Sequence, residues 1–298
     1  MTLVMIISST VIERLMSPLF AHYRRAFNEC APYLLTTREH QHLLELAPLG
    51  VSITKRDGVI DAQKRGNRDF LHLLQQLEKL TFGPLEMTMP KWVSYDAGIM
   101  PAGIFGFSSA APRLEDWVRS ALKVRPDYQG HVPLTQFISI PTPEEGSWYL
   151  HTFSSLNQVC MGAATPANLT LLTLCLGVRV FRMKRLYGGT QWRSTRLNKF
   201  VSLGPLEVIT AYTPNHSVPK TLTWRLELKR PLIEAALINN GASVAALPAT
   251  HMVDVDDEDA LKQMQSEIED GVRYQIVGQP MTRGSIVQVP VRRSEDRV

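Results

Sequence analysis

The spacing of apolar residues changes along the chain, from a helical repeat near the start to short apolar runs further on. From about Ser9 to Leu46, apolar residues recur at three- and four-residue intervals, which predicts helices interrupted at Pro18 and Pro32. The same repeat over Asp69–Leu80 predicts an amphipathic helix. Residues 1–80 are therefore expected to form a helical N-terminal region.

Beyond Thr81, short apolar runs bounded by Gly or Pro alternate with helical repeats. The runs predict strands at 91–98, 102–109, 132–141, 206–212 and 220–228, and a final hairpin from 274–280 and 284–291. The repeats predict helices at 112–124, 169–186, 194–202 and 231–241, and one that starts in the acidic run 254–259. Gly188 and Gly189 are expected to end the helix at 169–186.

This interleaving of strands and helices predicts an α/β or α+β fold with a mixed central sheet and flanking helices. The sheet and its helices are expected to occupy residues 81–230. Residues 231–298 are expected to add helices and a hairpin that pack on this core.

Composition narrows the class of protein but not its activity. Of the 298 residues, 44% are hydrophobic and 20% are charged, as in soluble globular proteins. Three widely spaced cysteines, with no CxxC or HExxH pattern, predict a reducing compartment, no disulfide framework and no zinc site. Glu13 and Arg14 interrupt the apolar N-terminus before it reaches the ~20 residues of a membrane span. We therefore expect a cytoplasmic protein.

Positive charge is concentrated in residues 179–230, where eleven Lys and Arg stand against Glu207 and Glu227. This excess of nine exceeds the net charge of +4 for the whole chain, so the other segments sum to about −5. Such segregation favours an anionic partner, either a phosphate-bearing small molecule or a nucleic acid. A solvated surface rich in Lys and Arg explains it equally.

The densest polar cluster, His151–Gln158, follows the predicted strand at 132–141 and is expected to be a loop. Ligands of α/β sheets gather where strands end. His151 would then transfer a proton or orient a substrate, with Ser154, Ser155 and Asn157 as hydrogen-bonding groups. Alternatively, the Ser and Asn side chains satisfy loop backbone groups.

Small residues lead into the helix that starts at Leu169, in the sequence MGAATPAN (161–168). They would let an anion approach the backbone N–H groups of the first turn. The residues expected to hold a phosphate-bearing ligand at this position are Ile140, at the end of the predicted strand, together with Gly162, Ala163, Thr165 and Asn168. The alternative is ordinary helix capping, with Thr165 at the N-cap and Pro166 in the first turn.

Further candidates lie at the ends of other predicted strands. Asp96 would act as a general base, with Tyr95 or Tyr187 as the acid, although Asp96 also suits a turn before Gly98. Thr190, Gln191 and Trp192 follow the basic end of the helix predicted at 169–186, and Trp192 would either stack on a base or ring or pack at a strand edge.

The order of these elements resembles the GNAT acyltransferase superfamily over roughly residues 81–228. The parts that carry the resemblance are VPLTQFISIP as central strand, the helix Leu169–Leu186, and TRLNKFVSLGPLEVI, where a short apolar helix ends at a glycine before a strand. Where the family has an Arg/Gln-x-x-Gly-x-Gly/Ala loop, this chain has MGAATPAN.

The resemblance implies that the amino end of the helix at Leu169 receives the pyrophosphate of acetyl-CoA or another acyl-CoA, in a slot beside Phe137. It implies direct acyl transfer to an amine that lies near Ser154, Asn157, Thr190, Gln191 and Trp192. The basic segment favours the divergent members that act on nucleobases in phage DNA. Two alternatives stay open: a non-catalytic nucleic-acid-binding or assembly protein of a mobile element, and a hydrolase that uses Ser154 or Ser155 with His151.

Overall fold

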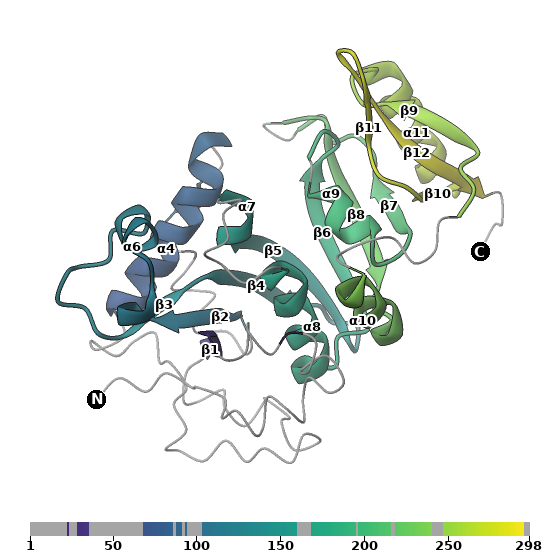
Figure 1. Cartoon of the computed structure of the whole chain (residues 1–298). Coiled ribbons are helices and arrows are strands. Elements are labelled where there is room, and N and C mark those ends of the chain that lie inside the picture. The colour runs from purple at the N-terminus through teal and green to yellow at the C-terminus, as the bar shows by residue number, and fades with distance from the viewer. Residues whose placement is uncertain are drawn as a thin grey trace. The chain divides into compact units, whose positions relative to one another are not determined.

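The computed structural model describes residues 23, 29–35, 68–85, 88–90, 93, 103–159, 168–194, 196–215, 218–239 and 247–294. These residues form a mixed α/β structure, with helices against a sheet in which every pair of strands with a described register is antiparallel (Figure 1). The fold class predicted from the sequence is confirmed. The chain divides into unit 1, residues 1–141 and 150–183, and unit 2, residues 142–149 and 184–298.

Unit 1 contains the strand order β1-β2-β4-β5, and β3 also pairs with β2. Its elements are β1 Ala31–Leu35, α4 Arg68–Phe82, the 3-10 helix η4 Gly83–Leu85, β2 Ile104–Ala110, the 3-10 helix η5 Ala111–Arg113, α6 Asp116–Ala121, β3 His131–Pro133, β4 Thr135–Pro141, most of β5 Ser147–Ser155, α7 Leu156–Val159 and α8 Leu169–Phe181.

Helices α8 and α4 cover opposite faces of this sheet. Thr135 Oγ1 lies 2.7 Å from Thr173 Oγ1 of α8, whereas Ile138 packs in a buried cluster with Phe70 and Leu74 of α4. Because side chains alternate along a strand, odd-numbered residues of β4 point to α8 and even-numbered ones to α4. The helix predicted at 69–80 is thus confirmed as α4.

Two strands of unit 1 lie where the sequence predicts other structure. β1 falls within the predicted N-terminal helices, and β5 includes His151–Ser155, which we expected to be loop. In β1, Tyr33 is buried and its hydroxyl donates to the carbonyl of Thr135 at 2.7 Å. Pairing with β2 along all five residues of β1 outweighs the helical spacing of the apolar residues.

Unit 2 contains the strand order β6-β8-β7-β10-β12-β11, and β9 also pairs with β12. Besides the first residues of β5, its elements are β6 Arg185–Gln191, α9 Leu197–Val201, β7 Leu206–Thr210, β8 Thr221–Glu227, α10 Arg230–Ile238, β9 His251–Asp254, α11 Glu258–Glu269, β10 Arg273–Ile276, β11 Met281–Arg283 and β12 Ile286–Ser294. The helices predicted at 194–202 and 231–241, the strands at 206–212 and 220–228, and the final hairpin are confirmed.

Burial alternates along β8 and along the first part of β6. The even-numbered residues other than Thr190 are buried beneath α9, where the rings of Phe200 and Trp224 lie 4.6 Å apart between centroids. From Arg185 to Gln191 and from Thr221 to Glu227, the odd-numbered residues are half-buried or exposed. One face of this sheet is therefore core and the other is polar.

The expectation that Gly188 and Gly189 end a helix is wrong. Helix α8 ends at Phe181, with Arg182 in a left-handed conformation (φ 52°), and both glycines lie within β6. A Cβ atom on Gly188 would come within 2.4 Å of the Trp224 ring. Gly188 is therefore a strand glycine that makes room for a buried indole, rather than a helix terminator.

Candidate functional site

The amino end of α8 lies beside the end of β5 in unit 1. Asn157 lies in α7, two residues after β5 ends, and its side-chain carbonyl Oδ1 accepts a hydrogen bond of 2.9 Å from the backbone N–H of Leu169, the first residue of α8. Its own N–H donates to Ser155 Oγ at 3.2 Å. A residue distant in sequence thus caps α8, a role that the loop interpretation of Asn157 did not include.

Asn168 precedes this helix in a left-handed conformation, with φ 60° and ψ 21°. Its side-chain N–H donates to the hydroxyl of Tyr23 at 3.1 Å. Within the first turn, Thr173 donates to the carbonyl of Leu169 at 2.8 Å. The first N–H groups of α8 are consequently held in place, where the helix dipole favours negative charge.

Along β5, the sequence-predicted residues point to different faces. His151 is exposed, and partial desolvation lowers the pKa of its imidazole, which favours the neutral, proton-accepting form. Ser154 is fully buried, and its hydroxyl has no hydrogen-bond partner in the structure described. His151 and Ser154 are therefore not brought together, because they lie three positions apart on a strand.

The slot expected beside Phe137 is filled by aromatic rings. Phe137 is fully buried, with the Phe105 ring 5.1 Å away on one side and the Phe153 ring 4.8 Å away on the other. Ile140, nearer the end of β4, is half-buried. The expectation of a slot beside Phe137 is therefore wrong, because aromatic packing closes that part of the sheet. Asp96, Gly162, Ala163 and Thr165 lie outside the described residues.

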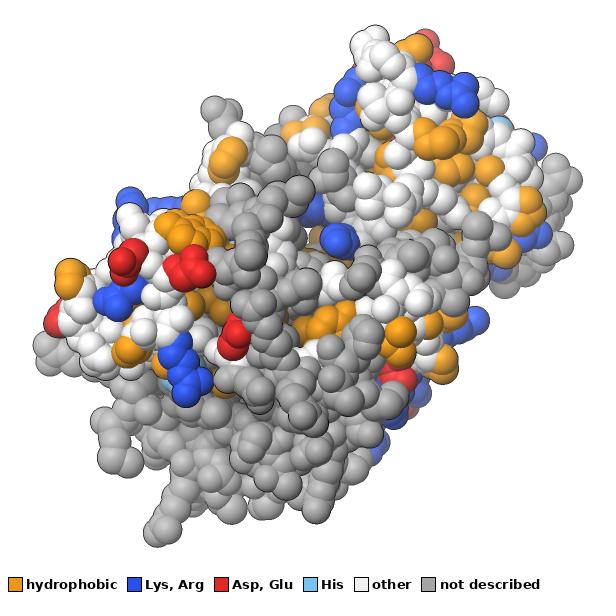
Figure 2. Space-filling model, viewed as in Figure 1, with side chains coloured by type: hydrophobic (Ala, Val, Ile, Leu, Met, Phe, Trp, Pro, Cys, Tyr) orange, Lys and Arg blue, Asp and Glu red, His pale blue; other side chains and the backbone are white. Residues whose placement is uncertain are grey.

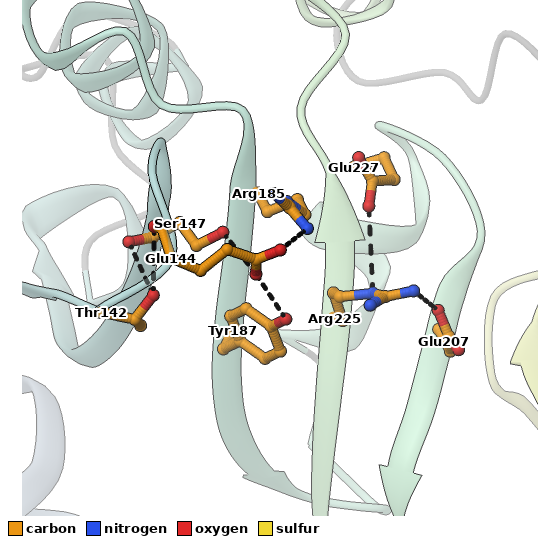
Figure 3. Close-up of polar contacts among 8 residues, drawn as sticks. All are labelled: Thr142, Glu144, Ser147, Arg185, Tyr187, Glu207, Arg225 and Glu227. Atoms are coloured by element: carbon orange, nitrogen blue, oxygen red, sulfur yellow. Dashed lines mark hydrogen bonds and ion pairs between the residues drawn. The ribbon is translucent and has the colours of Figure 1, made fainter.

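In unit 2, Tyr187 belongs to a polar cluster centred on Glu144 (Figure 3). Glu144 Oε2 accepts from Ser147 Oγ at 3.0 Å and lies 3.4 Å from the Tyr187 hydroxyl, while Oε1 pairs with Arg185. The Ser147 hydrogen bond and the Arg185 guanidinium lower the pKa of Glu144, so the cluster holds a carboxylate. Tyr187 is the predicted acid, and a carboxylate beside it was not predicted.

Arg225 of β8 continues this polar face. It lies opposite Tyr187 on β6 and opposite Glu207 on β7, with which it pairs. Glu207 also accepts from Arg273 at 3.3 Å. The alternation of buried and polar positions along β6 and β8 is the sequence signal that could have identified this row of polar side chains. The strand order that aligns the row cannot be read from the sequence.

The three residues expected near the acceptor, Thr190, Gln191 and Trp192, differ in their burial. Thr190 and Gln191 are half-buried at the end of β6. Trp192 is buried, and its indole N–H donates to the carbonyl of Ala211 at 2.8 Å. The structure thus gives Trp192 a packing position.

Much of the positive charge of residues 179–230 is neutralised within the fold. Within the described residues, at least six of the eleven basic side chains form ion pairs with carboxylates, namely Lys184, Arg185, Arg193, Lys220, Arg225 and Arg230. On the face drawn in Figure 2, Lys and Arg are scattered among other side chains rather than gathered into one patch. In the folded chain, carboxylates therefore balance part of the positive charge that is concentrated in this segment of the sequence.

None of the helices in the described part of the chain has the length and hydropathy to cross a membrane. In the same residues, no three His, Cys, Asp or Glu side chains are grouped so that they could hold a metal ion. Cys30 and Cys175 are buried thiols, and burial raises the pKa of Cys30 to about 12.

Comparison with known proteins gives structural likenesses only. Neither the protein-family models nor the curated proteins include a match. Among solved structures, an acetyltransferase of the GNAT family from Bacillus anthracis has a TM-score of 0.34 and 10% identity, and the alignment covers 54% of this chain and 89% of that one. A structure provisionally assigned as an acetyltransferase, from T. thermophilus, has a TM-score of 0.27 and 18% identity over 54% of this chain and 87% of that one. Because these TM-scores are below 0.5, the likeness adds nothing to what the strands and helices themselves define.

Proposed function

We propose that this chain transfers an acyl group from a CoA-type thioester to an amine. The observation that carries the proposal is the hydrogen bond from Leu169 N–H to Asn157 Oδ1, which joins the end of a central strand to the amino end of a 13-residue helix. Backbone N–H groups at such a position stabilise a pyrophosphate. The element order that resembles the GNAT superfamily supports the same assignment.

The residues at this position fit a pyrophosphate by their chemistry. In the first turn of α8, Leu169 N–H already donates to Asn157 Oδ1 and Leu172 N–H to the carbonyl of Asn168. The donors proposed for the pyrophosphate are therefore the N–H groups of Thr170 and Leu171, with the Asn168 amide and the Tyr23 hydroxyl beside them. A bound donor would supply the thioester carbonyl that the amine attacks. The chain's own residues would hold the phosphates at α8 and remove a proton from the amine.

His151 is the described residue best suited to accept that proton. Its lowered pKa keeps the imidazole neutral near pH 7, and its place on β5 is four residues before the strand ends. Asp96 remains the alternative base and Tyr187 the proposed acid. Asn157, Thr190 and Gln191 remain proposed acceptor contacts, whereas Ser154 is no longer proposed as one because it is fully buried.

A ligand-dependent melting experiment tests the proposal. At a concentration of 100 Kd, acetyl-CoA is expected to stabilise the protein by about 2.7 kcal/mol, which corresponds to a rise in Tm of several degrees. Equal stabilisation by inorganic pyrophosphate would indicate an anion site without donor specificity and would contradict the proposal. So would a Tm unchanged by acetyl-CoA and CoA.

The second candidate, a nucleic-acid-binding protein, is tested in the same experiment with a short DNA duplex. Binding through phosphate contacts weakens steeply with salt. Stabilisation by the duplex that disappears between about 50 and 200 mM salt, with none by acetyl-CoA, would favour this candidate. The six ion pairs in residues 179–230 leave it less support than the sequence alone gave.

A further inference from the structure

The polar face of unit 2 contains a glycine that packing does not require. Gly189 lies in the middle of β6 and is exposed. A Cβ atom added to it would meet only the Tyr149 hydroxyl, at 3.6 Å, which is ordinary van der Waals distance. Its neighbour Gly188, in contrast, is required by Trp224. A strand glycine costs roughly 0.5–1 kcal/mol relative to alanine, and often marks close approach of a ligand.

The side chains around Gly189 carry hydrogen-bonding groups. Tyr187 and Gln191 lie two positions to either side of it on the same face, and Thr223 of β8 lies directly opposite. Tyr149 is 38% exposed, with its hydroxyl close to the Gly189 backbone. We call the surface formed by Tyr149, Tyr187, Gly189, Gln191 and Thr223 the Gly189 patch.

The charges that border the Gly189 patch are already paired with one another. Arg225 pairs with Glu207, and Arg185 pairs with Glu144. A charged ligand would lose hydration on this surface without gaining an unpaired countercharge. An uncharged ligand with donors and acceptors along its edge is therefore the better match.

We propose that the Gly189 patch binds the ring of a neutral planar heterocycle of the nucleobase kind. The flat ring would lie on the exposed peptide of Gly189, beside the Tyr149 hydroxyl. Thr223, Gln191 and Tyr149 would hydrogen-bond to its edge. The patch includes Tyr187 and Gln191, the proposed acid and a proposed acceptor contact, so this inference names a ligand class for that part of the proposed site, and its test uses no acyl donor.

The competing explanation is structural, since a tyrosine that covers a strand glycine can stabilise a sheet. The two explanations differ in what a larger side chain does. If Tyr149 only shields the backbone, Gly189→Val changes stability alone. If a ring lies on Gly189, the valine side chain occupies its place and binding is lost.

Ligand-observed saturation-transfer NMR with cytidine tests the proposal on the full chain. Cytidine is chosen because it is not part of a CoA-type donor, so the outcome is separate from that of the acyl-transfer test. We expect stronger saturation of the cytosine protons than of the ribose protons. The dissociation constant from titration should rise about tenfold or more in Gly189→Val, which is a loss of about 1.4 kcal/mol.

Two further variants complete the experiment. Thr223→Val keeps the shape but removes the hydroxyl, and should weaken binding about fivefold. Gly83→Ala, in unit 1, adds a Cβ that meets nothing within 4 Å and should leave binding unchanged. An unchanged dissociation constant in Gly189→Val, saturation mainly of ribose, or no saturation at about 10 mM cytidine, a concentration that detects even millimolar affinity, would overturn the proposal.

Discussion

At the scale of single residues, the adjacent glycines of β6 face opposite environments and should respond differently to the same substitution. In Gly188→Ala the new methyl group would lie 2.4 Å from the Trp224 ring, and overpacking of this kind costs about 1–3 kcal/mol. In Gly189→Ala it meets only the Tyr149 hydroxyl at 3.6 Å, and the lower entropy of the unfolded chain should add about 0.4–1 kcal/mol of stability. Urea unfolding measures both. Equal effects of the two substitutions would contradict the alternation on which the polar face depends.

Asn157 offers a second test, because capping and donor binding depend on different properties of its side chain. Asn157→Ala removes the acceptor for Leu169 N–H and should cost about 1 kcal/mol. Asn157→Asp keeps an acceptor and adds a negative charge, which suits a helix amino end but repels a phosphate.

We therefore expect Asn157→Asp to unfold at the wild-type urea concentration or above, and to bind acetyl-CoA more weakly than wild type. Calorimetric titration of both variants measures this. Unimpaired binding by Asn157→Asp would separate the capping of α8 from donor binding and remove the main support for the proposed function.

Gln136 is a buried amide that should be replaceable. Both polar atoms of its side chain are buried, without a hydrogen-bond partner in the described structure, on the face of β4 that points to α4. Gln136→Met keeps the volume and removes the unsatisfied groups, so it should stabilise the protein by about 1–3 kcal/mol. Gln76→Met is the control, because Gln76 Nε2 lies 3.3 Å from His72 Nε2 and loses that contact. Destabilisation by Gln136→Met would show that the amide has a partner.

At the scale of elements, α4 buries a carboxyl group that should make stability depend on pH. Glu78 is 4% exposed and its Oε1 accepts from Met89 N–H at 2.8 Å. Burial raises its pKa, against smaller opposing effects of that hydrogen bond and of Lys79. The folded protein thus holds the proton more tightly than the unfolded chain, and this contribution is complete below the unfolded pKa and is lost as pH rises through the folded pKa.

Glu78→Gln keeps an acceptor for Met89 and removes the titration. The difference in unfolding free energy between variant and wild type should therefore grow from about pH 4 upward, by at most about 1.4 kcal/mol per pH unit, and then level off. Urea unfolding across pH 4–8 measures that difference. A difference independent of pH would show that Glu78 is not desolvated as its burial implies.

Elements whose spacing and local chemistry agree could be predicted from the sequence, and those decided by distant partners could not. Helix α4 has a helical apolar repeat and forms as predicted. β1 has the same kind of repeat, but pairing with β2 decides its conformation. Gly188 is a plausible helix terminator by sequence, and only the position of Trp224 across the sheet explains it.

The candidate site was predictable to a smaller extent, for the same reason. The start of α8 at Leu169 could be inferred from the small and polar residues before it, whereas its capping by Asn157 could not. The pairing of Glu144 with Arg185, and of Glu207 with Arg225, joins residues on different strands and depends on register. Sequence spacing carries no information on that register until the strand order is known.

At the scale of the whole molecule, residues 247–294 close the edge of the unit 2 sheet beside β7. β10 pairs with β7 at Leu206 and Glu207, and further along the Gln265 side chain of α11 accepts from Ala211 N–H at 2.8 Å. Asp256 adds an ion pair to Arg193, with Arg193 Nε 2.9 Å from Oδ1. Two elements of the C-terminal part thus pair with the backbone here, β10 with the start of β7 and α11 with Ala211, which follows β7.

A chain that ends at Asn239 would leave this edge unpaired, and an unpaired edge strand is a template for association with another chain. We expect the shortened protein to self-associate in light scattering after size exclusion and to unfold at a lower temperature than the full chain. A chain that lacks only residues 295–298 is the control and should behave as the full chain. If the chain ending at Asn239 has the molecular mass of a single copy and the melting temperature of the full chain, the C-terminal part does not protect β7, and its strands serve another purpose.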